Sequence, residues 1–121
     1  MSVFEAIYSK LLADETFSPI VDGRIYHVHA SQKVRAPYVI ITPITSDPAQ
    51  VHSGASEIKH VLFQFSCFAA SFSAAIEMRD ALIAALDGVA LGNGDIPTLQ
   101  DERSSFEEAV ELHRADCDFL I

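Results

Sequence analysis

A proline followed by an apolar run opens a strand early in this chain. Residues 36–41 read Ala-Pro-Tyr-Val-Ile-Ile. Proline has no backbone N–H and is tolerated at the start of a strand, whereas aromatic and β-branched residues favour a half-buried pleated surface. We therefore expect a strand over residues 38–44, with a bulge or an edge position at Pro43. The preceding Arg-Ile-Tyr segment predicts a short first strand over residues 24–28.

Two amphipathic helices accompany these strands. A serine with a glutamate three residues later, Ser2 and Glu5, forms a capping box, and apolar residues then recur at helical spacing over residues 3–13. A second helix is expected from a cap at Ser71 or Ser73 to about residue 87. Its buried stripe is predicted to comprise Ala75, Met78, Leu82, Ala85 and Leu86.

Two later segments alternate in polarity, as half-buried strands do. Residues 57–68 predict the strongest strand, and residues 110–121 predict the closing strand. Shorter strands are considered over residues 89–91 and 96–100, whereas residues 101–108 are expected to be charged and exposed. The predicted core faces of the two long strands comprise Lys59, Val61, Phe63, Phe65 and Cys67, and Ala115, Cys117, Phe119 and Ile121.

This order of elements predicts an α+β fold in one domain spanning residues 1–121. Helices and runs of consecutive strands favour an antiparallel sheet, here of four to five strands, with two helices packed on one face. The second face carries enough polar groups to meet solvent or another subunit. Residues 16–23 are expected to form a loop, and the serine-rich residues 46–56 a long hairpin loop.

Composition narrows the range of functions. The chain carries 17 acidic against 8 basic side chains, a formal charge of −9, which argues against tight binding to duplex DNA. No apolar run approaches the about 20 residues that cross a bilayer. The first residues lack the basic and apolar regions of a signal peptide, so we expect synthesis in the cytosol and no membrane partner.

Histidines offer the first candidate site. His27 and His29 have the spacing that places two side chains on one face of a strand, where they could bind a metal ion. A zinc site needs further ligands, and nothing places His52, His60 or His113 beside this pair. Exposed strand histidines are the favoured interpretation, with no metal and no cofactor.

The two cysteines offer the second candidate site. Cys67 and Cys117 lie in alternating apolar runs, where a free thiol behaves as a small hydrophobe. Cys67 and His113 could form a nucleophile with its base. However, neither a glycine elbow nor a helix N-terminus accompanies Cys67 to activate it. Buried thiols are therefore favoured over a reactive cysteine or a disulfide.

The C-terminal third is acidic. Its carboxylates could form an acid–base pair or a cation site, but their spacing is not that of an EF-hand, and a solvated or lumen-facing charged surface is favoured. The glycine-rich residues 92–95 lack the lysine of a phosphate-binding loop and predict a turn. The acidic residues considered are Asp95, Asp101, Glu102, Glu107, Glu108, Glu111, Asp116 and Asp118.

Several of these features, taken in order, match one family over nearly the whole chain. They are a helix over residues 3–13, Gly-Arg-Ile-Tyr at 23–26, the run 36–41, the aromatic strand 61–68, a helix over 74–86 followed by Asp-Gly, and a final strand over 114–121. In this order and spacing the chain resembles the tail-completion proteins of long-tailed bacteriophages and prophages, which are also called tail-terminator or head–tail joining proteins.

This resemblance implies a non-enzymatic virion assembly protein. Such subunits form a ring, typically a hexamer, at the head-proximal end of the tail, where the ring stops growth of the tube and joins the tail to the head. The implied partners are further copies of the chain, the tail tube protein and the head connector protein. DNA crosses the lumen without specific binding, and acidic lumen groups would repel its phosphates. The implied location is the tail or neck of the virion, after assembly in the host cytoplasm.

The polar loop is the candidate contact with a neighbouring subunit or with the tube. Its composition suits a segment that orders on assembly, although an idle hairpin loop is an equal alternative. Two other functions stay open: a small metal- or cysteine-dependent enzyme, and a dimeric α+β module that binds a ligand. The candidate contact residues are Asp47, Gln50, Val51, His52 and Glu57.

Overall fold

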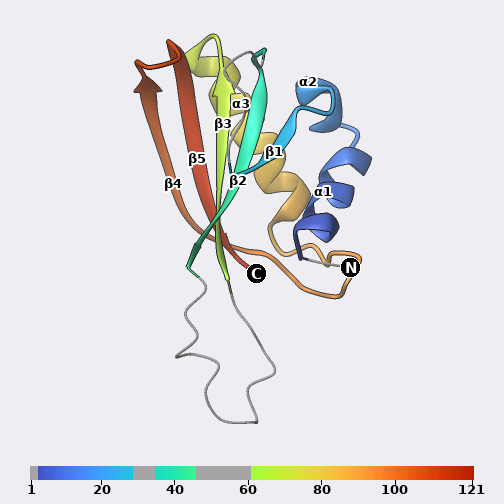
Figure 1. Cartoon of the computed structure of the whole chain (residues 1–121). Helices are drawn as coiled ribbons and strands as arrows, with labels where there is room; N and C mark the ends of the chain where they lie inside the picture. Colours follow the sequence, from blue (N-terminus) through green and yellow to red (C-terminus); the bar gives the residue numbers. More distant parts are fainter. Residues whose placement is uncertain (1–2, 29–34, 46–60) are drawn as a thin grey trace.

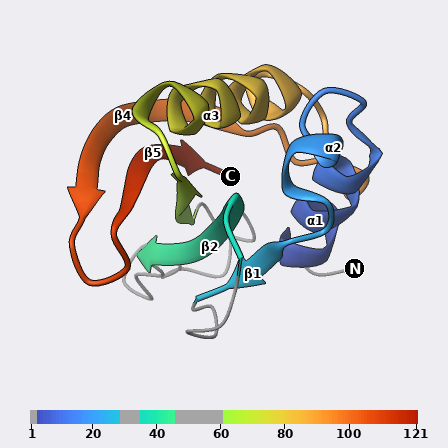
Figure 2. The same ribbon diagram turned by 90° about the horizontal axis from the view of Figure 1, so that it is seen from above.

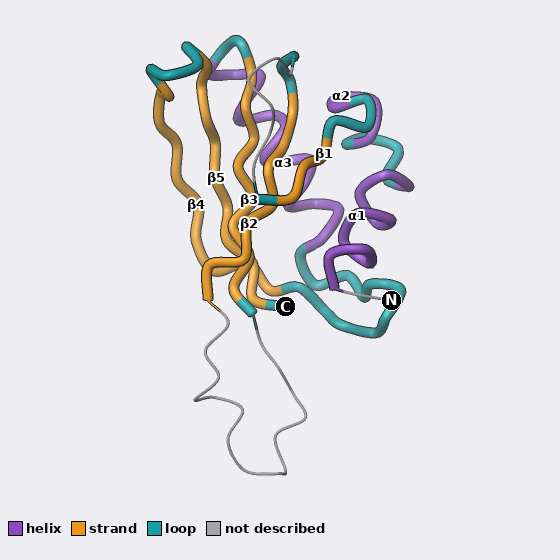
Figure 3. The backbone as a smooth tube through the Cα atoms, in the orientation of Figure 1, coloured by secondary structure: helices purple, strands orange, loops and turns teal. Residues whose placement is uncertain are grey.

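A computed structural model describes residues 3–28, 35–45 and 61–121 of the chain (Figures 1 and 3). These residues contain three helices and five strands. In chain order they are α1 (Val3–Ala13), α2 (Ser18–Val21), β1 (Ile25–His27), β2 (Tyr38–Thr45), β3 (Leu62–Ala69), α3 (Phe72–Leu86), β4 (Thr98–Glu107) and β5 (Leu112–Leu120). None of the helices in these ranges is long and apolar enough to cross a membrane.

The strands form one sheet in the order β1-β2-β3-β5-β4. Three of the strand pairs are antiparallel, which confirms the predicted α+β class, but β1 runs parallel to β2. Arg24, just before β1, donates a 2.8 Å hydrogen bond from its Nε to the carbonyl of Pro37, just before β2. This bond joins the starts of the two strands and so reinforces their parallel pairing.

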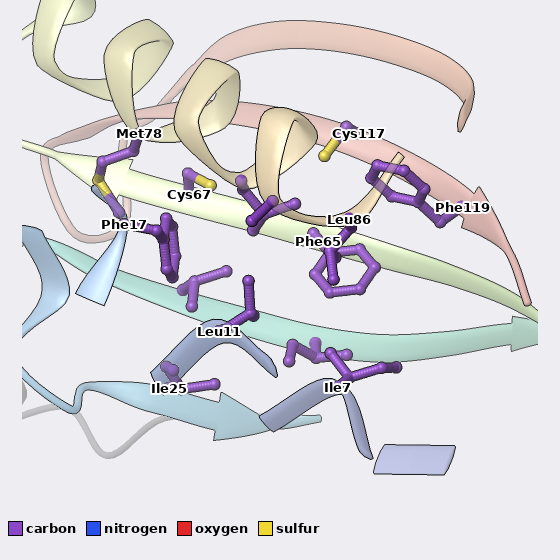
Figure 4. Packing of buried hydrophobic residues seen from close by; sticks show 14 of the residues in the cluster. Ile7, Leu11, Phe17, Ile25, Phe65, Cys67, Met78, Leu86, Cys117 and Phe119 are labelled. Carbon is purple, nitrogen blue, oxygen red and sulfur yellow. The ribbon is translucent and has the colours of Figure 1, made fainter. Parts of the chain in front are cut away.

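Both long helices cover one face of the sheet, as predicted (Figure 2). Side chains from α1 and α3 pack there against Phe65, Cys67 and Phe119 (Figure 4). Burial of one large apolar side chain stabilises the fold by about 1.5–3 kcal/mol, so this layer is the main source of stability. The predicted stripe of α3 is fully confirmed, since Ala75, Met78, Leu82, Ala85 and Leu86 are all buried.

The helix α3 begins at the first of its two candidate caps. Ser71 has extended backbone angles, and its Oγ accepts a 3.1 Å hydrogen bond from the Ala74 N–H. Ser73 lies inside the helix. Gly88 follows the helix with φ +72°, a conformation that favours glycine, and its N–H donates to the Pro97 carbonyl at 2.9 Å.

Residues 16–23 contain a helical turn, so the prediction of a loop throughout this segment is wrong. The Asp14 carboxylate accepts hydrogen bonds from the N–H groups of Thr16, at 3.0 Å, and Phe17, at 2.7 Å. The short helix α2 then starts with Pro19 in its first turn, where the missing N–H costs little. Phe17 is wholly buried, so its burial holds the turn in place against the proline and glycine signals.

The strand β4 is longer than the sequence predicted. The predicted short strand ends at residue 100, but β4 continues to Glu107. Its charged residues up to Arg103 are exposed as expected, whereas Glu107 is half-buried. Asp, Glu and Arg have low strand propensity, and here the segment is a strand because it pairs with β5 along its length. Residues 89–91 form no strand.

The other strands match their predictions closely. The pairing of β2 with β3 shifts register between Pro43 and Thr45, which confirms the predicted bulge. The strand β5 begins at Leu112 instead of residue 110, because Glu111 adopts φ 53° in the preceding turn. The first residues of the predicted strand 57–68 lie outside the described ranges, and its remaining core positions are buried or half-buried.

Candidate functional site

The sheet face away from α1 and α3, here called the second face, carries an organised set of polar side chains. Strand periodicity places alternate residues of β2, β3, β5 and β4 on it. The pairing register aligns Ile40, Ser66, Asp116 and Arg103 across the four strands. Three polar residues on this face are buried although none of the described helices covers them: Ser66, Asp116 and Asp118.

One half of this face is organised by Arg103 on the edge strand β4. Its two terminal nitrogens donate to the two carboxylate oxygens of Asp118 at 2.9 and 3.0 Å. It also contacts Asp101, donates to Gln64 Oε1 at 3.2 Å, and lies 3.8 Å from Asp116. Hydrogen bonds to Asp118 and then Asp101 raise the pKa of the Arg103 guanidinium further above its ordinary value.

The other half is organised by Arg114 on β5. Its Nε donates to both carboxylate oxygens of Asp116, at 2.8 and 3.0 Å. Its terminal nitrogens reach Glu107 Oε2 at 3.3 Å and Ser66 Oγ at 3.2 Å, and its guanidinium carbon lies 5.6 Å from the centre of the Phe68 ring. Burial alone would lower the pKa of Arg114, but the hydrogen bonds to Asp116 and Glu107 outweigh it and raise that pKa.

An aromatic row continues this face toward β1. The Tyr38 and Phe68 rings stack with their centres 4.9 Å apart, and Tyr26 meets Tyr38 edge-on at 6.1 Å. Burial, and then the charge of Glu107, raise the pKa of the Tyr38 hydroxyl, so it stays protonated at neutral pH. The second face thus changes from charged on β4 and β5 to aromatic on β1 and β2.

This geometry ties the charged groups of the second face to one another. A buried carboxylate is tolerated only when it is paired and hydrogen-bonded, and Asp116 and Asp118 are both held by arginines. The expectation that all acids of the C-terminal third are solvated is therefore wrong for these two. It holds for Asp95, Asp101, Glu102, Glu108 and Glu111, which are exposed.

The histidines predicted as possible metal ligands are not gathered. His27 is exposed and stacks on Phe4, with ring centres 4.3 Å apart. His113 lies between Phe106 and Phe72. Over the described ranges, no three His, Cys, Asp or Glu side chains come together as a metal site. His29, His52 and His60 lie outside those ranges.

Both thiols are buried and free, as the sequence predicted. Cys67 and Cys117 lie on the core face of β3 and β5 and are inaccessible to solvent. Burial strongly raises the pKa of each thiol, so the reactive thiolate is disfavoured. This environment argues against Cys67 as a nucleophile.

Comparison with protein families decides among the remaining possibilities. The family model described as "Tail completion protein gp17" matches residues 5–121. The chain belongs to the tail completion protein gp17 family. The resemblance stated from the sequence is thereby confirmed, and with it the expectation of a structural virion protein instead of an enzyme.

A solved structure supports the fold of this tail completion family member. A chain of the "Virion of native gene transfer agent (GTA) particle" has a TM-score of 0.73 and 21% sequence identity. The match covers 98% of this chain and 92% of that chain. At this identity the likeness establishes the fold. No curated protein sequence matches the chain significantly.

The loop residues chosen from the sequence stay a prediction. Residues 46–60 lie outside the described ranges, and all five candidate contact residues fall within them: Asp47, Gln50, Val51, His52 and Glu57.

Sequence reasoning missed the charge network of this tail completion protein, although one part of it was visible. The final predicted strand has charged residues at every second position, Arg114, Asp116 and Asp118, and such positions share one face of a strand. The partner Arg103 could not be placed, because its segment was not assigned to a strand. Without β4 there was no reason to pair Arg103 with a carboxylate 15 residues away.

Proposed function

We propose that this protein assembles as a ring at the head-proximal end of a phage-type tail, where it ends growth of the tail tube and joins the tail to the head. The family match over residues 5–121 carries the proposal. The fold shared with a chain of a gene transfer agent virion supports it, because that chain is itself part of a virion particle. The ring, which we expect to be hexameric, resides in the tail or neck after assembly in the host cytoplasm.

The partners follow from this position. They are further copies of the chain, the tail tube protein on one side and the head connector protein on the other. DNA passes through the lumen during ejection. A formal charge of −9 suits a channel through which DNA slides freely, since negative side chains repel the phosphates of DNA.

The second face supplies a physical basis for assembly. Its arginines and buried aspartates are fixed by one another, so docking on this face orders few additional side chains. Binding that requires little ordering loses less free energy to conformational entropy. The face is therefore suited to a permanent protein contact.

The polar loop over residues 46–56 is proposed as a second contact, with the neighbouring subunit or the tube. This proposal rests on its polar, serine-rich composition. Deletion of residues 47–55 should reduce ring formation and tail joining. Unchanged assembly of the deletion variant would remove the loop from the account.

The function is tested by electron microscopy of particles made without this protein. Tails of uncontrolled length, or tails separate from filled heads, are the expected result, and expression of the chain from a plasmid should restore joined particles. Tails of normal length attached to heads in its absence would contradict the proposal. The alternative of a dimeric ligand-binding module would show in solution as a mass of two chains under all conditions.

A further inference from the structure

An exposed aromatic patch lies at the turn between β4 and β5. Phe106 and Phe72 flank His113, with ring centres at 5.1 and 6.3 Å from it. Phe72 is 54% exposed, Phe106 51% and Val110, in the turn itself, 44%. Large apolar side chains gathered at the surface mark interaction sites. We call Phe72, Phe106, Val110 and His113, with the neighbouring Glu108 and Glu111, the hairpin patch.

The rim of the hairpin patch is negative. Glu108 and Glu111 are exposed, and among the described residues neither forms an ion pair. Glu107 is also close but is held by Arg114 at 3.3 Å. A partner for this patch should therefore combine cationic groups with a surface that can cover two aromatic rings.

The segments before β1 and β2, on the other side of the same sheet, carry such cations. Arg24 precedes β1, and its Nε is bound to the Pro37 carbonyl. Arg35, two residues before Pro37, is exposed and makes no ion pair within the described ranges. Asp22 lies 3.9 Å from Arg24 and offsets part of this charge. We call Arg24 and Arg35 the basic corner.

The hairpin patch and the basic corner lie at the same level along the strands. Phe106 pairs with His113, and His113 pairs with Ala69. Phe68, the residue before Ala69, pairs with Tyr38. Because β2 and β3 are antiparallel, Pro37, the residue before Tyr38, is level with Ala69. The β4–β5 turn and the start of β2 accordingly lie at the same end of the strands, with β3 between β2 and β5 (Figure 1).

We propose that the hairpin patch of one copy binds the basic corner of the next copy. Two different surfaces of one chain make a head-to-tail contact, which closes into a ring when the rotation between copies closes. Because the two surfaces share a level, successive copies can meet side by side without a shift along the strands. This inference rests on the proposed ring and specifies its subunit interface.

Charge exchange tests this contact. Glu108→Arg with Glu111→Arg in one variant, and Arg35→Glu in another, each place like charges across the contact. Each variant alone should need at least about tenfold more protein to form the ring seen with the wild type, by native mass spectrometry or sedimentation. Mixing the two should restore rings in which they alternate, and combining all three changes in one chain should restore rings of a single species.

Controls separate the contact from folding and from the proposed function. Glu15→Arg changes an exposed acid in the α1–α2 connection and should leave assembly unchanged. Phe72→Ser with Phe106→Ser should weaken assembly while circular dichroism shows a folded chain. If all these patch and corner variants form rings as readily as the wild type does, this inference is wrong and the proposed function still stands.

If the purified chain does not form rings on its own, the contact can be tested by cross-linking within assembled particles. Glu108→Cys with Arg35→Cys, treated with a short bis-maleimide, should link neighbouring copies in purified particles. The native thiols are buried and should not compete. A ring present in the particles but without this cross-link would contradict the contact. Particles that contain no ring of this protein would contradict the proposed function itself.

Discussion

Arg103 and Asp118 are joined by two parallel hydrogen bonds, of 2.9 and 3.0 Å, across the pairing of β4 with β5. This bidentate contact connects the edge strand, which is exposed along most of its length, to a carboxylate that is only 13% exposed. Charged pairs with this geometry are stronger and more directional than single contacts. The contact therefore fixes the position of β4 relative to the rest of the second face.

Replacing Arg103 tests this role. Arg103→Ala leaves the buried Asp118 carboxylate without its bidentate partner. Loss of one member of a buried pair costs about 3–5 kcal/mol, and since Arg103 is 41% exposed we expect about 2 kcal/mol of the free energy of unfolding to be lost. Urea unfolding measures this value. Arg35→Ala, which removes an exposed arginine without an ion pair in the described ranges, should change it by less than about 0.5 kcal/mol.

The helix cap gives a sharper test of local structure. Ser71→Ala removes the hydrogen bond to the Ala74 N–H and should cost about 1 kcal/mol. Ser73→Ala, inside the first turn of α3, should be nearly neutral because alanine has the higher helix propensity. Thermal or urea unfolding of the two variants distinguishes them. Equal losses would show that Ser71 does not act as the cap.

The core between α3 and the sheet should be sensitive to a loss of volume. Leu82 is fully buried in the apolar cluster. Leu82→Ala is expected to cost about 2–5 kcal/mol, from lost burial and from the cavity that remains. Leu12→Ala is the matched control. It makes the same change at a side chain that is 38% exposed and should lower the free energy of unfolding much less. Comparable losses at both positions would contradict the core described here.

The buried thiols predict a pH dependence of stability. Burial raises the pKa values of Cys67 and Cys117, so both stay protonated in the folded chain, whereas a thiol of the unfolded chain ionises near about pH 8.5. The unfolded state thus loses protons first, and the free energy of unfolding should fall as the pH rises above about 8.5. Denaturation at several alkaline pH values measures this trend.

A double variant isolates the thiol contribution. Cys67→Ala with Cys117→Ala should flatten the alkaline part of the stability profile, although it lowers stability at neutral pH through lost packing. A thiol reagent should also label the native cysteines slowly at pH 8 and rapidly in urea. Fast labelling of the folded wild-type chain would contradict the burial of both groups.

Much of the helix-bearing face was predictable from the sequence, for a physical reason. The stripe of α3 and the core positions of β3 and β5 follow from periods set by local geometry, 3.6 residues for helices and 2 for strands. The family resemblance depended on the same segments. The local pattern of apolar residues was therefore enough to predict elements that bury one side, because burial of one side makes apolar and polar residues alternate regularly.

The rest depended on contacts between distant segments. The strand β4 is held by pairing with β5, against the low strand propensity of its charged residues. The parallel direction of β1 depends on its pairing with β2, and the helix α2 depends on the burial of Phe17. None of these partners is adjacent in the sequence. The charge network on the second face could be assembled only after β4 was in place.

The most direct test of this account is the position of the protein in the assembled particle. Cryo-electron microscopy of purified particles that carry a small tag on this chain should show tag density in one closed ring at the junction of tail and head. Density distributed along the tail tube, confined to the distal tip, or absent from tailed particles would contradict a protein that completes the tail.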